Sequence, residues 1–133
     1  MKEEVKTEKT GRKMENRITE NLRDRTKKYA IKIVHFYSLL PSKSHEAQII
    51  GKQVLRSGTS ARANYREACR ARSDSEFVSK IGIVVQELDE TIYWLELLFD
   101  AKINSSAELK TLLSEANELI AIFTSIVKKV RRK

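Results

Sequence analysis

Apolar side chains recur at intervals of three and four residues in four separate stretches of this chain. That spacing places them along one side of an α-helix. The first stretch runs through Leu22, Tyr29, Ile33, Phe36 and Leu40. Because the residue before a proline is pushed out of the α region, we expect this helix, over about residues 19–40, to end before Pro41.

The second stretch predicts a helix over about residues 44–71, with Ser44 as its N-cap. Its inward series is mostly small, which favours close approach of a neighbouring helix. The series is Ala47, Ile50, Val54, Ser57, Ala61, Asn64 and Ala68.

Two capping boxes, in which a serine and a glutamate three residues later each satisfy a free backbone N–H, mark the remaining helices. Ser73 with Glu76 opens a predicted helix over about 74–100, and Ser105 with Glu108 opens one over about 105–131. Short links between four helices favour antiparallel neighbours. The predicted fold is therefore all-α, an up-down four-helix bundle forming one domain over residues 18–130. Residues 1–17, charged and almost without apolar anchors, are expected to form a flexible arm.

The residues offer little for catalysis or metal binding. Di-metal bundles use Glu-x-x-His pairs, and neither His35 nor His45 follows a glutamate at that spacing. Cys69 is the only cysteine, which excludes a disulfide framework. No glycine-rich phosphate loop or dinucleotide fingerprint is present. From these absences we expect a protein that is not an enzyme and has no metal or other cofactor. We also expect it to be cytoplasmic, since neither a signal peptide nor a membrane-spanning run occurs.

Charge is distributed unevenly along the chain. Residues 41–72 hold seven Lys or Arg against two Glu, whereas residues 73–100 hold one Lys against seven acidic residues. On the second helix the cations fall within an arc of roughly 120°, nearly opposite the small apolar face. They are Lys52, Arg56, Arg62, Arg66 and Arg70.

An up-down bundle brings the start of the first helix and the ends of the second and fourth helices to one pole. The cations that would meet there are Arg23, Arg25, Lys27, Lys28, Arg66, Arg70, Arg72, Lys128, Lys129, Arg131, Arg132 and Lys133. Such a pole attracts polyanions through phosphate contacts and release of counterions. No zinc finger, helix-turn-helix or RNA-recognition signature is present, so we expect salt-sensitive binding that does not read base sequence.

Two alternatives use the same charges differently. In the first, the arginines form an ordinary solvated helix face. In the second, they dock on the acidic third helix of a second subunit, with Glu87 and Glu90 as carboxylates and Tyr93 and Trp94 as aromatic anchors. A contact between two different faces closes into a ring if its rotation permits.

The run from Val54 to Ala68, VLRSGTSARANYREA, resembles a bacterial four-helix-bundle family, the 23S rRNA intervening-sequence proteins. The match continues in order through SDSEF at 73–77, ELDET at 87–91 and YWLE at 93–96. It covers about residues 20–130. The family's N-Y-x-E signature falls on Asn64, Tyr65 and Glu67, and its arginine on Arg56.

The resemblance implies a left-handed antiparallel bundle that assembles as a homopentameric ring, with Asn64, Tyr65 and Glu67 expected at the oligomer interface. It implies no catalytic residues. A related branch serves diversity-generating retroelements, where a basic pentamer is thought to bind nucleic acid and the reverse transcriptase. The partners expected from this resemblance are further copies of the chain, rRNA or another nucleic acid, and a protein.

Overall fold

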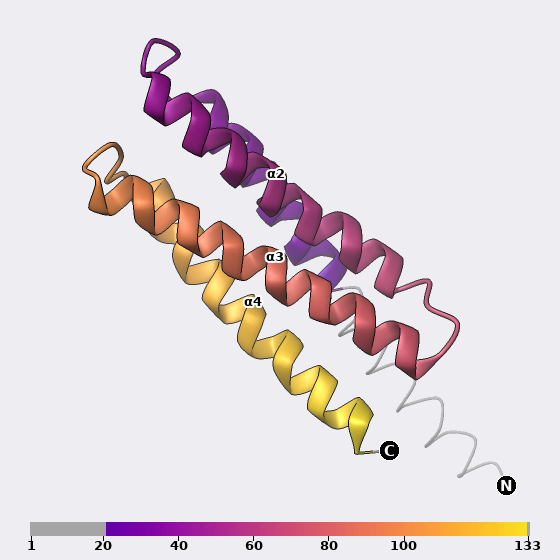
Figure 1. Ribbon diagram of the computed structural model, residues 1–133. Coiled ribbons are helices and arrows are strands. Elements are labelled where there is room, and N and C mark those ends of the chain that lie inside the picture. Colours follow the sequence, from indigo (N-terminus) through magenta and orange to yellow (C-terminus); the bar gives the residue numbers. More distant parts are fainter. Residues whose placement is uncertain (1–20, 133) are drawn as a thin grey trace, which may run out of the picture.

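The protein is a bundle of four antiparallel helices without strands, seen in a computed structural model that describes residues 21–132 (Figure 1). The described part of the first helix covers residues 21–38. It is followed by α2 (His45–Ala68), α3 (Asp74–Asp100) and α4 (Ala107–Arg131). The all-α four-helix fold predicted from the sequence is confirmed. The predicted arm at 1–17 and the start of the first helix lie outside the described residues.

The N-caps show why three of the helices begin where they do. Ser44 and Ser73 each accept a hydrogen bond from the backbone N–H three residues later, as predicted. The fourth helix differs, since its cap is Ser106, which accepts from the N–H of Leu109. The prediction of Ser105 is therefore wrong by one residue. Asn104 Oδ1 accepts from both the backbone N–H and the hydroxyl of Ser106, which holds that serine in the capping position.

In the capping box at α3, the serine bond is as predicted, but the glutamate binds a different backbone N–H. Glu76 accepts a hydrogen bond from the backbone N–H of Arg72, one residue before the cap. This bond ties the connection between α2 and α3 to the first turn of α3.

The core is built from one apolar stripe of each helix. Most of the predicted inward positions are buried, and Leu22, Ile33, Val54, Val84, Leu88, Leu112 and Phe123 are among them. In α2 the inward series differs at two places: Ile50 is partly exposed, and Tyr65 rather than Asn64 turns inward. Tyr65 is 3% exposed and packs against Phe123, with 5.2 Å between ring centroids.

The first helix packs between α2 and α4. Tyr29 is buried and donates a hydrogen bond of 3.0 Å from its hydroxyl to the Leu112 carbonyl of α4. Its burial raises the pKa of that hydroxyl. On the other side, Gly58 of α2 faces Ile33 so closely that an added Cβ would lie 2.7 Å from Ile33 Cγ1. The small residues of α2 therefore do permit a close approach.

The turn after α3 contains the one described non-glycine residue with positive φ, Lys102 at 59°. Its N–H donates to the Phe99 carbonyl, and the N–H of Ile103 donates to the Leu98 carbonyl. This is the Schellman arrangement, which satisfies carbonyls left open at a helix end. No turn signal in the sequence, such as glycine, marks this position.

Candidate nucleic-acid interface

The end of α2, the start of α3 and the end of α4 lie at the same end of the bundle (Figure 1). We call the exposed cations there the basic pole: Arg66, Arg70, Arg72, Lys128, Lys129, Arg131 and Arg132. None of them forms an ion pair with any residue of the described range 21–132. The structure thus brings together the two predicted groups of cations, from α2 and from the C-terminal end.

Part of this charge also stabilises the helices themselves. The last turn of α2 contains Arg66, and that of α4 contains Lys128, Lys129 and Arg131. Cations near a helix C-terminus interact favourably with the partial negative charge of its open carbonyls, by roughly 0.3–1 kcal/mol each. That effect requires no ion partner, so these side chains keep their charge available to a ligand.

Two carboxylates near the basic pole already have partners within the subunit. Glu67 accepts a 2.7 Å hydrogen bond from Lys80 of α3, which lowers the pKa of that carboxyl. Glu76 is bound to the Arg72 backbone. A shallow hollow between α2 and α3 is lined by Arg70 and Arg72 together with both of these glutamates and Lys80. Its mixed charge makes it a poor phosphate cradle, whereas the cations around it project into solvent.

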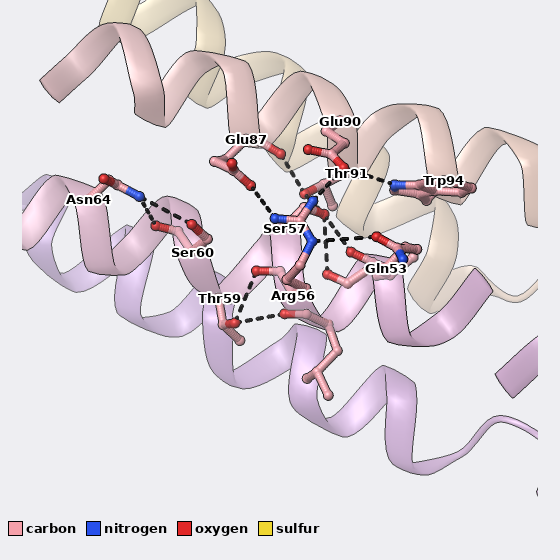
Figure 2. Close-up of polar contacts among 12 residues, drawn as sticks. Gln53, Arg56, Ser57, Thr59, Ser60, Asn64, Glu87, Glu90, Thr91 and Trp94 are labelled. Carbon is pink, nitrogen blue, oxygen red and sulfur yellow. Dashed lines mark hydrogen bonds and ion pairs between the residues drawn. The ribbon is translucent and has the colours of Figure 1, made fainter. Parts of the chain in front are cut away.

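Arg56 belongs to the predicted cationic stripe, but its charge is already paired with carboxylates of the same subunit. Its guanidinium bridges Glu87 and Glu90, which lie nearly one turn apart on α3 (Figure 2). The hydrogen bond from Arg56, followed by that from Trp94, lowers the pKa of Glu90. Figure 2 shows that this network lies directly over the contact between α2 and α3.

The rest of the stripe is divided between exposed and half-buried positions. Lys52 is exposed, while Arg62 is half-buried with its Nη1 atom enclosed and lacking a hydrogen-bond partner among the residues described. Of the first-helix cations predicted at the basic pole, Arg25 bonds Glu115 at 2.7 Å and Lys28 bonds Asp24 at 2.8 Å.

The predicted oligomer-interface residues have different environments. The prediction for Tyr65 is wrong, because its ring is buried within the subunit. Asn64 donates to the carbonyl and hydroxyl of Ser60 on its own helix, and Glu67, like Glu87 and Glu90, has an ion partner inside the chain.

Tyr93 is 57% exposed and stacks edge-on against the half-buried Trp94. The sequence interpretation missed two exposed aliphatic residues on the first helix, Ile31 and Val34. Their position off the apolar stripe was the available signal.

Within residues 21–132 no three His, Cys, Asp or Glu side chains are placed to share a metal ion. Both histidines are exposed. None of the helices described has the length and apolar character needed to cross a bilayer.

The comparisons with known proteins agree with each other. The model of the family described as "23S rRNA-intervening sequence protein" matches residues 12–125. A crystal structure from Bacteroides thetaiotaomicron, of a protein of unknown function from the S23 ribosomal protein family, is 35% identical with a TM-score of 0.73. The similarity covers 80% of this chain and 97% of that one. Neither description names a catalytic activity. Among functionally curated proteins, none matches.

Proposed function

Because this chain belongs to the 23S rRNA-intervening sequence protein family, we propose that it is a non-catalytic bundle that binds structured RNA through its basic pole. The observation that supports this proposal is the gathering of seven exposed cations at one end of the bundle, none of which forms an ion pair within residues 21–132.

The binding that these side chains favour is directed at the phosphate backbone. Each cation that neutralises a phosphate releases condensed counterions, so affinity falls steeply as salt rises. Five of the seven residues are arginines, whose planar fork suits two phosphate oxygens at once. The sequence contains no zinc-finger, helix-turn-helix or RNA-recognition motif, so recognition should rest on the shape of the folded RNA.

The test is a titration of a structured 23S rRNA fragment at several salt concentrations. We expect the variant Arg70→Gln/Arg72→Gln/Arg131→Gln to bind at least tenfold more weakly at low salt. Each lost contact should also flatten the slope of log K against log salt by roughly 0.7–0.9.

The matched control removes the same charge from the opposite end of the bundle. Lys43, Lys102 and Lys110 are exposed there, and Lys43→Gln/Lys102→Gln/Lys110→Gln should leave binding nearly unchanged. Equal losses in both variants, or no binding by the wild type at 50 mM salt, would contradict the proposal.

A second candidate function, a scaffold that assembles into a homopentamer, is favoured by the outer surface of α3. Tyr93 and Phe99 are 57% and 42% exposed on a helix that carries an excess of carboxylates. Aromatic side chains of this kind are enriched in protein interfaces. Native mass measurement tests it: the wild type should form a ring of five, and Tyr93→Ser/Phe99→Ser should shift it toward monomer.

A further inference from the structure

One flank of the bundle combines aliphatic side chains with lysines, and none of its six residues is acidic. The first helix contributes Lys27, Ile31 and Val34, and α2 contributes Lys52, Leu55 and Thr59. We call these six residues the lateral face. Ile31 and Val34 are 45% and 47% exposed, and Leu55 is half-buried.

Contacts between the two helices place these residues side by side. The Tyr37 hydroxyl donates to Gln48 Oε1, which identifies the flank of each helix that turns toward the other. Gly58 lies opposite Ile33, and Gly51 lies opposite Leu40. In this antiparallel register Val34 and Ile31 are level with Leu55 and Thr59.

Lys52 and Lys27 lie beyond this apolar centre at either end, about 17 Å apart along the axis at 1.5 Å per residue. The lateral face is thus an apolar patch, three helical turns long, with a cation at each end.

The nearest carboxylates do not balance these cations. Asp24, the sole acidic residue in the described part of the first helix, is bound to Lys28. On α2, Glu67 is bound to Lys80 of α3 on the opposite flank, and Glu46 lies in the first turn. Within residues 21–132 neither Lys27 nor Lys52 forms an ion pair, so the lateral face carries positive charge around its aliphatic centre.

RNA binding does not account for this composition. Aliphatic side chains offer no charge for phosphates, and they provide no aromatic surface on which bases stack. An amphipathic helix does match it, since such a helix lays apolar residues at i, i+3, i+4 and i+7 into a complementary surface. The lysines at the two ends of the patch favour a helix with carboxylates in its first and last turns, where they can form ion pairs.

We propose that the lateral face docks an acidic amphipathic helix of a partner protein, some 11–15 residues long. Leucine-like side chains of the partner pack on Ile31, Val34 and Leu55. Its glutamates or aspartates pair with Lys27 and Lys52. This interaction uses none of the residues of the basic pole, so it stands or falls separately from RNA binding.

The probes are two synthetic 15-residue helical peptides with the same leucine face, one with glutamates and one with lysines on the flanks. Their binding to the full-length protein is followed by fluorescence anisotropy. The glutamate peptide should bind with micromolar affinity, and the lysine peptide at least tenfold more weakly. Ile31→Ser/Val34→Ser should weaken the glutamate peptide at least tenfold while leaving RNA binding unchanged.

The control variant, Leu39→Ser/Ile49→Ser, removes two aliphatic residues that are 77% and 53% exposed outside the lateral face, and should bind the peptide like the wild type. Charge reversal by Lys27→Glu/Lys52→Glu should invert the preference toward the lysine peptide, a gain of binding that misfolding cannot produce.

Three results would overturn the proposal. The first is equal binding of both peptides by the wild type, and the second is an equal loss in the control variant. The third is dissociation of a self-assembled form by Ile31→Ser/Val34→Ser, which would assign the lateral face to a second copy of this chain.

Discussion

The two long sides of α2 meet their neighbours through opposite chemistry. Toward the first helix, α2 presents Gly51 and Gly58, so that Ile33 and Leu40 occupy the space where side chains would stand. Toward α3 it presents Ser57, whose hydroxyl is 2.7 Å from that of Thr91, with the Arg56 bridge to Glu87 and Glu90 above it (Figure 2). The contact with the first helix depends on the small volume of the two glycines, and the contact with α3 depends on paired polar groups.

This difference shows how the two contacts determine which helices pack against each other. A close apolar contact tolerates no added atom but does not by itself choose a partner. A buried hydroxyl pair adds little net stability, yet a partner helix without the matching hydroxyl leaves a polar group unsatisfied. The first side is therefore sensitive to added volume, and the second to the loss of one partner.

The largest effect is expected from Gly58→Ala. The new methyl would lie 2.7 and 2.9 Å from Ile33 Cγ1 and Cδ1. Ile33 is β-branched and fully buried, so it has little room to shift. Overpacking should outweigh the helix-propensity gain and lower the free energy of unfolding by about 1–2 kcal/mol, measured by urea denaturation.

Gly82 supplies the control for that measurement. It lies inside α3, is exposed, and an added Cβ would meet nothing within 4 Å. Gly82→Ala should therefore raise the free energy of unfolding by up to about 1 kcal/mol. A similar gain in Gly58→Ala would show that the two helices are not in close contact there.

A smaller effect is expected on the α3 side from Thr91→Val. This change keeps the side-chain shape and removes the hydroxyl that contacts Ser57 in a site where both residues are 0% exposed. We expect a loss of about 1 kcal/mol, because Ser57 is left without that partner. Adding Ser57→Ala should cost less than the sum of the two single changes in a double-mutant cycle. Strict additivity would mean that the two hydroxyls do not interact.

The smallest effect is expected from Arg56→Gln. The ion pairs lie at the surface, where such pairs contribute about 0.2–1 kcal/mol, and Lys52→Gln removes an unpaired neighbour as control. The hydrogen bond from Arg56 lowers the pKa of Glu90 in the folded state. The stability that this pair contributes is therefore fully present above the ordinary pKa of a glutamate. It is lost as pH falls through the lower pKa that Glu90 has in the folded state.

The free energies of unfolding of wild type and Arg56→Gln should accordingly differ at pH 7, and the difference should shrink as pH falls below the ordinary carboxyl pKa of about 4.3. A difference that persists in acid would assign the role of Arg56 to packing of its aliphatic stem.

The sequence predicts the helices well because the apolar stripes, the serine caps of α2 and α3, and Pro41 are local signals. It fails where tertiary contacts decide. Asn64 and Tyr65 both fit steps of three or four after Ala61, and only the packing of Tyr65 on Phe123 selects the second. Similarly, the charge of Arg56 is visible in the sequence, but its carboxylates lie 31 and 34 residues away on another helix. The basic pole was predictable because it follows from helix direction alone.

Lys102 gives the bundle a reserve of stability far from its charged end. A residue with a side chain in the left-handed region costs roughly 1 kcal/mol relative to glycine, yet the turn already makes both of its backbone hydrogen bonds. A glycine at this position would keep the geometry and relieve only the steric cost. Such a background would let destabilising changes near the other pole be studied for their effect on binding, without loss of the folded state.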